Sequence, residues 1–291
     1  MPQFDLISVV IPAYNEAAGI GQTLDQLYQV MKTIGSPYEI LVINDGSGDA
    51  TAQIAAAKGA IVLNHPYNIG NGAAVKTGLR RAAGEVIILM DADGQHPVQV
   101  IPNLLQFIPQ YDMVVGARSH SSQATLIRRW GNKAYNSLAT YITGKKIEDL
   151  TSGFRVIKKP VAKKFIYLLP NGFSYPTTIT LSLLKAGYSL KYVAIDAQKR
   201  QGKSKLNTSF EAARFFIIIL RIATLFSPLK IFLPISVFSL TLGLAYGSYM
   251  IIVHSHFSNM VLLLMITALV VFLMGLIAEE IALLRIERSE D

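Results

Sequence analysis

The chain has 291 residues, no cysteine and a net charge of +8, and 51% of its residues are hydrophobic. The missing cysteines exclude disulfide bonds, thiolate metal sites and cysteine nucleophiles. The length allows one large domain or two smaller ones, and the hydrophobic content exceeds what a soluble enzyme usually needs. The positive charge is compatible with anionic lipid, nucleic acid or a phosphorylated substrate as partner.

The first 120 residues alternate short apolar runs with helical patterns. Apolar residues recur at spacings of three and four residues from Ile20 to Ile34, which predicts a helix. Asp49 and Gly59 fit the N-cap and the end of a second, Ala-rich helix. A third helix is expected around Ala73–Ala83. This order is typical of an α/β fold with a mostly parallel, Rossmann-like sheet. The predicted strands are Ile7–Ile11, Glu39–Ile43, Ala60–Leu63, Val86–Met90 and Met113–Val115.

The strand at Val86–Met90 leads into Asp91-Ala92-Asp93-Gly94-Gln95. Ionised carboxylates cannot stay inside a covered sheet, so we expect them at the rim where the strand ends, which is where open α/β sheets bind ligands. Alternate residues of an extended chain point the same way, so Asp91 and Asp93 could share a hard cation, with Gln95 as a third oxygen ligand. An ordinary solvated turn is the alternative for this pattern.

The other loops narrow the choice of fold. A dinucleotide-binding domain would carry G-x-G-x-x-G after its first strand, but the sequence there is Pro12-Ala13-Tyr14-Asn15-Glu16, and a Walker loop is also missing. The stretch 68–72 is rich in glycine and opens a helix, so its amides could face a phosphate; a simple glycine turn explains it equally well.

Two uncharged stretches, Ile231–Val253 and Met260–Ala278, approach the ~20 residues that cross a bilayer. We interpret them as a transmembrane hairpin with spans at about 231–253 and 260–280; two buried core helices are the alternative. Lysine and arginine flank the pair on its outer sides and are missing from the short loop between the spans, which predicts that both chain ends are cytosolic. The first six residues lack a basic region, so no export signal is expected.

Five short motifs follow one another along the chain. They are Pro-Ala-Tyr-Asn-Glu at 12–16, Asn-Asp-Gly-Ser at 44–47, Asp-Ala-Asp-Gly-Gln at 91–95, Gly-Ala-Arg at 116–118 and Ser-Gly-Phe-Arg at 152–155. Together they resemble the family-two glycosyltransferases of the GT-A fold, and more narrowly the polyprenyl-phosphate hexosyltransferases, meaning dolichyl-phosphate mannose synthases and undecaprenyl-phosphate glucosyltransferases. The resemblance covers the first ~205 residues in order and extends to the hairpin.

The resemblance implies a role for each matching residue on the donor side. Arg118 would face the phosphates, and Asp149, three residues before Ser152, would orient the acceptor or the sugar unless it is only a helix cap. Asn44 stands where many relatives have the first of two aspartates. The nucleotide would be held by Pro12, Ala13, Tyr14, Glu16 and Asp45, and the metal, Mg²⁺ or Mn²⁺, by Asp91, Asp93 and Gln95.

Basic residues mark the acceptor side. Guanidinium groups bind phosphate oxygens in a forked geometry, so arginines here could meet a lipid phosphate, although an exposed arginine can also be simply solvated. The run 199–205 resembles the family element R-x-x-G-x-S-K, with Lys199 or Arg200 in the place of its arginine; an anionic-lipid anchor is the alternative for this run. The expected acceptor-phosphate residues are Arg118, Arg128, Arg155, Arg200 and Lys205.

We therefore expect an inverting, metal-dependent transferase of one hexose from a nucleotide sugar, of GDP-mannose or UDP-glucose type, to polyprenyl phosphate. The expected domains are a GT-A catalytic domain at 1–206, an amphipathic interfacial helix at 207–228 and the hairpin at 229–291. The protein would be integral to the plasma membrane of a prokaryote or to the endoplasmic reticulum, with its catalytic domain cytosolic and no nucleic acid partner. The oligomeric state is open, with a homo-oligomer among the options.

Two other functions fit the same sequence. One is an enzyme of the same fold with another lipid acceptor, such as diacylglycerol. The other is a non-catalytic membrane subunit that binds nucleotide sugar, and the acids at 91 and 93 weigh against it.

Overall fold

A computed structural model describes residues 2–118, 126–172, 174–196, 223–256 and 258–287, and the side chains within these ranges except at 126–132 and 285–287. The contacts within the chain divide it into two compact units, Met1–Leu206 and Asn207–Asp291. Each unit is described by itself below.

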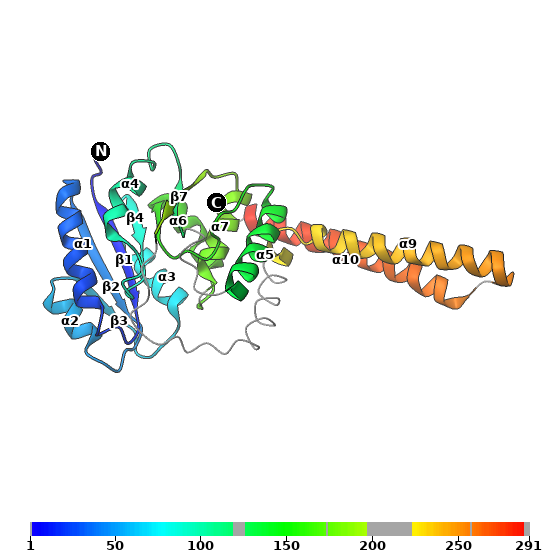
Figure 1. The fold of residues 1–291 in the computed structure, drawn as a ribbon, viewed down its shortest axis with the longest axis horizontal. Coiled ribbons are helices and arrows are strands. Elements are labelled where there is room, and N and C mark those ends of the chain that lie inside the picture. Colours follow the sequence, from blue (N-terminus) through cyan, green and yellow to red (C-terminus); the bar gives the residue numbers. More distant parts are fainter. Residues whose placement is uncertain (1, 119–125, 173, 197–222, 257, 288–291) are drawn as a thin grey trace. The chain divides into compact units, whose positions relative to one another are not determined.

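The first unit is built on one seven-stranded sheet (Figure 1). The strand order is β3-β2-β1-β4-β6-β5-β7. All neighbouring strands are parallel except β6, which runs antiparallel to both β4 and β5. The strands are β1 (Ile7–Ala13), β2 (Tyr38–Asn44), β3 (Ile61–Asn64), β4 (Val86–Leu89), β5 (Met113–Arg118), β6 (Arg155–Lys158) and β7 (Leu190–Ile195).

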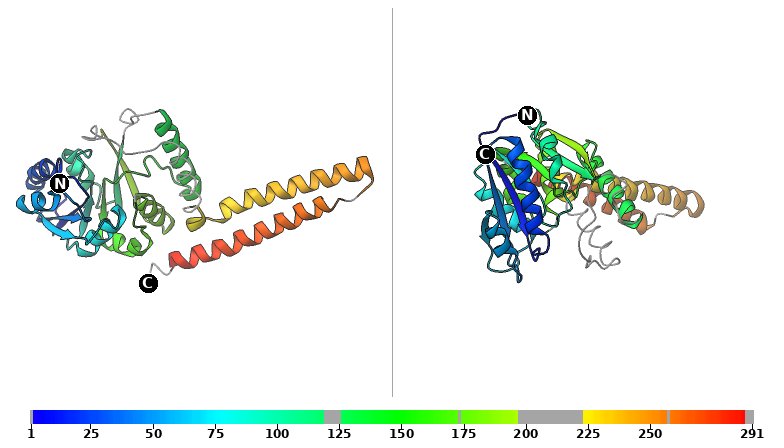
Figure 2. Two further views of the ribbon diagram at one scale, coloured as in Figure 1. Left: turned by 90° about the horizontal axis from the view of Figure 1, so that it is seen from below. Right: turned by 60° about the vertical axis from the view of Figure 1, so that its left-hand side comes forward.

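Helices cover both faces of this sheet (Figures 1 and 2). One buried apolar cluster packs α1 (Ile20–Ile34), α2 (Thr51–Ala57) and α4 (Ile101–Leu105) against one face. A second cluster packs α3 (Asn71–Arg81), α6 (Lys159–Phe165) and α7 (Tyr175–Lys185) against the other. The central strands are therefore buried on both sides, as their continuous apolar runs require. The remaining elements of this unit are α5 (Leu126–Thr143) and the 3₁₀ turns η1 (Val98–Val100) and η3 (Ile166–Leu168).

The predicted mostly parallel α/β fold is confirmed, and the strands and helices expected in the first 120 residues are present with shifted ends. The difference that matters most is at β4, which ends at Leu89. Sequence reasoning did not predict β6 and β7, whose pairing joins residues far apart in the chain.

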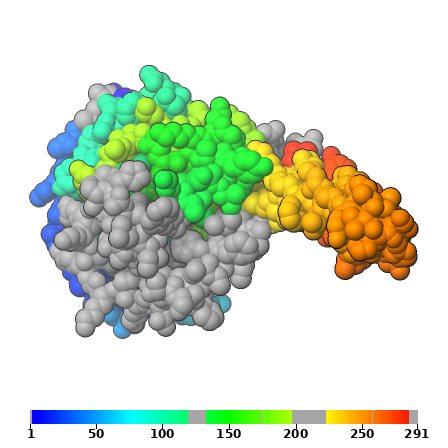
Figure 3. All heavy atoms as spheres, turned by 45° about the vertical axis from the view of Figure 1, so that its right-hand side comes forward, coloured from blue at the N-terminus to red at the C-terminus, as the bar shows by residue number. Residues whose placement is uncertain are grey.

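The second unit contains the two long apolar helices α9 (Leu229–His254) and α10 (Asn259–Glu287), which pack side by side as a hairpin (Figure 2). Both are long and apolar enough to cross a membrane. The buried residues of α9 are small ones, Ser236, Ser239, Gly243 and Gly247, and they form the seam against α10. Outside this seam the large apolar side chains of both helices are mostly exposed. Figure 3 shows the surface of this hairpin in yellow to red.

Hydrogen bonds fix how the two hairpin helices fit together. Ser236 Oγ donates to the Ala268 carbonyl at 2.8 Å, and Ser239 Oγ donates to the Leu264 carbonyl at 3.1 Å. Small residues let apolar helices approach closely, and hydroxyl bonds across the seam satisfy polar atoms that lipid would leave unpaired. The interfacial helix expected at 207–228 falls largely outside the described residues.

Gly78 gives a direct test of how α3 packs on the sheet. A Cβ atom at this position would lie 2.2 Å from Cγ1 of the buried Val10 in β1, so Gly78→Ala must push α3 away from the sheet. We expect the variant to lose about 1–3 kcal/mol of unfolding free energy. Chemical denaturation of the full-length protein in detergent measures this change. Gly48→Ala is the matched control, since no atom of the described residues lies within 4 Å of its added Cβ; equal stability of the two variants would contradict the packing.

Candidate functional site

The carboxyl ends of the parallel strands meet at one edge of the sheet. β4 stops at Leu89, paired with Val10, while β1 continues to Ala13. Because β6 is antiparallel, its first residue, Arg155, pairs with Leu89, so the segment before β6 arrives at this same edge. Ligands of open α/β sheets bind at such an edge, and the predicted site residues that the structure describes lie on or beside the segments that reach it.

The loops after β1 and β2 are joined by hydrogen bonds. The Asn15 amide N–H donates to Ser47 Oγ at 3.0 Å, and Asn15 Oδ1 accepts from the Gly48 amide at 2.9 Å. Asn15 has a φ of 56°, a left-handed conformation that asparagine tolerates better than most residues. Tyr14, next to it, leaves the sheet with 48% of its surface exposed, whereas Pro12 and Ala13 are buried in β1.

Asp45 is buried and holds the glycine-rich loop. Its carboxylate lies 2.7 Å from His65 Nδ1 and accepts the Ile69 and Gly70 amides at 3.0 and 2.8 Å. His65 Nε2 lies 2.9 Å from Thr77 Oγ1 in α3. Only 3% of the Asp45 side chain is exposed, and its carboxylate holds the loop at 69–70; its contact with a nucleotide base stays a prediction.

Asp91 and Asp93 lie in a turn, which corrects the premise that they alternate along an extended strand. The strand ends at Leu89, and Gly94 closes the turn with a φ of +71°. Asp93 Oδ1 accepts the Gln95 amide at 3.1 Å, and about a third of the Asp91 side chain is exposed. Gly94 can close the turn because glycine adopts a positive φ without strain.

The oxygen-donor set nevertheless fits Mg²⁺ or Mn²⁺. Such hard ions take one or two protein carboxylates and complete their coordination with substrate phosphate and water. Among the residues that the structure describes, no three His, Cys, Asp or Glu side chains gather in a cluster that could hold a metal. The residues that could hold such an ion are the two carboxylates of the turn, with Gln95 beside them, and substrate phosphate and water would supply the remaining oxygens.

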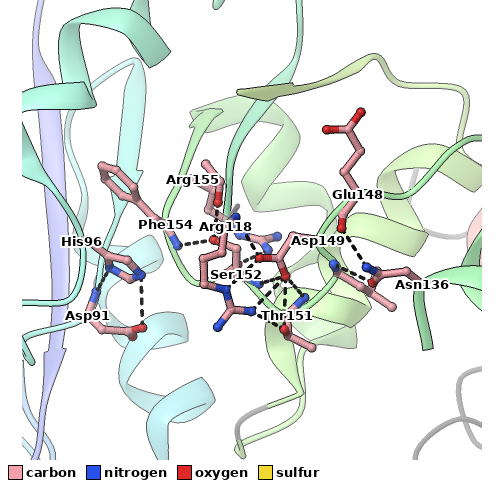
Figure 4. Close-up of polar contacts among 12 residues, drawn as sticks. Asp91, His96, Arg118, Asn136, Glu148, Asp149, Thr151, Ser152, Phe154 and Arg155 are labelled. Atoms are coloured by element: carbon pink, nitrogen blue, oxygen red, sulfur yellow. Dashed lines mark hydrogen bonds and ion pairs between the residues drawn. The ribbon is translucent and has the colours of Figure 1, made fainter. Parts of the chain in front are cut away.

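Arg118, at the end of β5, forms a bidentate ion pair with Asp149 (Figure 4). Its Nε and Nη2 atoms donate to Asp149 at 2.8 and 2.9 Å, and Nη2 also donates to Thr151 Oγ1 at 2.5 Å. Asp149 accepts the amides of Arg118, Thr151 and Ser152 as well. The Nη1 atom makes no hydrogen bond within the described part of the chain, and 31% of the arginine side chain is exposed.

The charges of this pair support each other. Burial alone would raise the pKa of Asp149, but the hydrogen bonds and charge of Arg118 outweigh it and the pKa is lowered. Burial would likewise lower the pKa of Arg118, and Asp149 raises it instead. Asp149 is therefore a permanent carboxylate that orients a permanent cation. It is neither a helix cap nor a group placed to take a proton at neutral pH.

The prediction that Arg155 meets a lipid phosphate is corrected by its burial. None of its surface is exposed, and its guanidinium donates to the carbonyls of Ser152 and Pro176 and to Thr180 Oγ1. Burial lowers its pKa, and its Nε has no hydrogen-bond partner among the described residues. Arg155 therefore ties the segment before β6 to α7 from within. The apolar residues that follow Arg155 in β6 do not indicate that its own side chain points inward.

The other acceptor-side residues are only partly described. Arg128 lies in α5, in the part of that helix whose side chains are not described, and Arg200 and Lys205 lie outside the described residues. Sequence reasoning missed His65 and His96. Both directly follow the ends of parallel strands or their turns, so the rule that placed the aspartates at this edge could have found them.

Solved structures share this fold. Glucosyl-3-phosphoglycerate synthase from Mycobacterium tuberculosis, in complex with Mn²⁺, UDP and phosphoglyceric acid, superposes with a TM-score of 0.60 at 18% identity over 75% of this chain and 78% of that one. A further mycobacterial protein superposes with a TM-score of 0.58 at 17% identity over 76% of this chain and 73% of its own. The catalytic-domain fold is thus GT-A-like.

The chain belongs to glycosyl transferase family 2, whose model matches residues 8–166, more than half of its length. Residues 227–284 match a second model, the GtrB C-terminal hairpin, which covers both long apolar helices. The family predicted from the five sequence motifs is therefore confirmed, together with the hairpin that follows it.

Curated relatives are undecaprenyl-phosphate 4-deoxy-4-formamido-L-arabinose transferases. The protein of Pectobacterium carotovorum is 28% identical over 68% of this chain and 62% of its own length. That of Shewanella sediminis is 34% identical over 60% of this chain and 57% of its own. The matched part thus spans about 57–62% of these relatives.

The Arg118–Asp149 pair predicts a pH-dependent contribution to stability. A carboxylate whose pKa is lowered by folding stabilises the protein above its unfolded value, near ~3.9, and loses that effect as pH falls through the folded value. Asp149→Asn should therefore cost about 1.5–3 kcal/mol at pH 7 and progressively less below pH ~4. Urea unfolding at several pH values measures this, and an equal cost at pH 7 and pH ~2.5 would refute it.

A second prediction concerns the loop held by Asp45. Asp45→Ala removes the acceptor for the Ile69 and Gly70 amides, so these amides should exchange with solvent at least tenfold faster, as for a lost hydrogen bond of about 1.4 kcal/mol. Hydrogen–deuterium exchange measured by mass spectrometry on the peptide containing residues 68–72 tests this. The peptide of β4, remote from the change, should keep its protection, and unchanged exchange in both peptides would contradict the assigned role.

Proposed function

We propose that the chain is an inverting, metal-dependent glycosyltransferase that moves one hexose from a nucleotide sugar to polyprenyl phosphate at the cytosolic membrane face. The observation that carries the proposal is that the carboxylate turn at 91–93 and an arginine oriented by Asp149 lie at the same edge of the sheet. Carboxylates that fit a divalent ion and a guanidinium with a nitrogen left for a ligand are the groups that a diphosphate leaving group needs.

The chemistry asks little of a general base. A lipid monophosphate has a second pKa near ~6, so at neutral pH it is mostly a dianion and can attack the anomeric carbon directly. A single displacement of this kind inverts that carbon. The engagement of Asp149 with Arg118 agrees with such a reaction, because this carboxylate orients a cation and has no proton to accept from the acceptor.

Different residues of the site would bind the metal, the phosphates and the nucleotide. Asp91 and Asp93, with Gln95, would hold Mg²⁺ or Mn²⁺, which when bound supplies charge neutralisation for the departing nucleoside diphosphate. Arg118, oriented by Asp149, would bind phosphate oxygens through Nη1. Tyr14 and Glu16, with the strand end at Pro12 and Ala13, would border the nucleotide.

The acceptor side rests on three basic residues and on the hairpin. Arg128, Arg200 and Lys205 would bind the lipid phosphate, while α9 and α10 anchor the chain in the bilayer with both ends cytosolic. The curated relatives carry undecaprenyl phosphate in their names, which supports a polyprenyl phosphate as the acceptor class. The sugar named for these relatives is theirs, and it is not assigned to this chain.

Asp93→Ala is the decisive variant for this proposal. Loss of one of two metal carboxylates should lower transfer by at least about 100-fold, while the protein stays folded in the membrane. The measurement is nucleoside diphosphate release with GDP-mannose, UDP-glucose or UDP-N-acetylglucosamine as donor and a short polyprenyl phosphate as acceptor, with and without EDTA.

Asp25→Ala is the matched control, because Asp25 is an exposed acid in α1 that pairs with Lys58 away from the strand ends. It should keep full activity. Transfer by Asp93→Ala at the wild-type rate, or activity undiminished by EDTA, would overturn the metal assignment. Efficient transfer to diacylglycerol that short polyprenyl phosphates do not compete with would overturn the acceptor assignment.

A further inference from the structure

A glycine lies directly against the Asp91 carboxylate. A Cβ atom added at Gly153 would lie 2.7 Å from Asp91 Oδ2 and 3.3 Å from its Cγ and Oδ1. No backbone atom is among these three nearest neighbours, so an alanine would meet the end of the Asp91 side chain rather than the fold itself. The side chain of Asp91 would have to rotate to make room. Gly153 therefore leaves space for one particular orientation of this carboxylate.

His96 also lies beside Asp91 (Figure 4). Its Nδ1 accepts the Asp91 amide at 3.1 Å, which places the ring proton on Nε2, and Nε2 lies 3.8 Å from Asp91 Oδ2. The imidazole stacks on Phe154, with ring centroids 5.0 Å apart and planes 14° from parallel. Phe154 is fully buried, so the imidazole has a fixed support.

Gly153 and Phe154 belong to the segment 149–154, which also orients Arg118. Asp149 and Thr151 bind its guanidinium, and Ser152 Oγ donates to the Gly116 carbonyl at 2.6 Å, two residues before Arg118 on β5. The Gly116 amide in turn donates to the Phe154 carbonyl at 2.9 Å. One short segment therefore contacts both the metal-side carboxylate and the phosphate-side guanidinium, which come from different strands.

Ordinary core packing does not explain this arrangement by itself. A third of the Asp91 side chain is exposed, and an exposed carboxylate does not need a glycine packed against it to stay folded. A site that binds an ion does need its carboxylate held in one orientation, because small errors in ligand geometry cost affinity. The close contact is thus better explained by the orientation of a ligand than by stability.

We propose that Gly153 and His96 are positioning residues for Asp91, and that segment 149–154 couples metal binding at Asp91 to the orientation of Arg118. The inference rests on the proposed function and adds two residues and a linkage to it. It identifies the ligand as a divalent cation together with the phosphate groups that Arg118 contacts. A substitution that moves the Asp91 carboxylate is therefore expected to alter the orientation of Arg118, and one that releases Arg118 is expected to weaken metal binding at Asp91.

The test uses Gly153→Ala in the full-length protein and follows Mn²⁺ binding by electron paramagnetic resonance, with and without UDP. We expect 10–100-fold weaker Mn²⁺ binding, an unchanged melting temperature, and recovery of the transfer rate at saturating Mn²⁺. Gly172→Ala is the matched control, since its added Cβ has no neighbour within 4 Å in the part of the chain that the structure describes, and it should bind Mn²⁺ as the wild type does.

Asp149→Asn tests the linkage, because Asp149 contacts Arg118 and lies at the other end of the segment. It should weaken Mn²⁺ binding several-fold. Gly153→Ala that binds Mn²⁺ like the wild type would overturn the positioning role, and a normal Mn²⁺ affinity in Asp149→Asn would overturn the coupling. A wild-type protein that binds no Mn²⁺ with or without UDP would instead refute the metal assignment of the proposed function.

Discussion

The ion pair between Arg118 and Asp149 is the interaction on which the arrangement of the site depends. It joins the end of β5 to the segment before β6, and the donors to Asp149 include two of the three guanidinium nitrogens, Nε and Nη2, and three backbone amides. A carboxylate with so many donors has a lowered pKa and a fixed position, and it fixes its arginine in turn. The Nε and Nη2 edge of the guanidinium is thus occupied by Asp149, and Nη1 is left for a ligand.

The antiparallel strand β6 gives this pair its place. In a fully parallel sheet the segment before a strand would enter from the opposite edge, far from the strand ends that bind ligands. Because β6 runs the other way, residues 149–154 reach the carboxyl end of β4, next to the turn at 91–93. The buried Arg155 then ties this segment to α7 through carbonyl and hydroxyl acceptors, and it forms no ion pair with an acid in the described part of the chain.

Much of the fold could be predicted because its signals are local. The apolar spacing of α1 and the continuous apolar run of β4 are properties of neighbouring residues, and so is the long uncharged stretch of α9. The orientation of β6 could not be predicted, since it depends on pairing with residues far away in the chain. Asp91 and Asp93 were placed at the correct edge, but the strand ended sooner than its apolar run, so the assumed alternation was wrong.

The site residues show the same limit. Motifs located the acids and Arg118 along the chain, but burial decided their roles: Asp45 points inward to His65, and Arg155 is wholly enclosed. An arginine or aspartate reads the same in the sequence whether it faces solvent or a buried carbonyl. Only the packing of the segments around it distinguishes the two.

The hairpin contains a feature that fixes how far one helix can slide along the other. The Leu229 amide, at the partly buried start of α9, donates to a Glu279 carboxylate oxygen of α10 at 3.0 Å. Sliding by one turn, about 5.4 Å, would break this bond and also part the serine hydroxyls from their carbonyls. These hydrogen bonds therefore hold the two helices in a single axial register. The hairpin would move as one rigid unit, without sliding of one helix along the other.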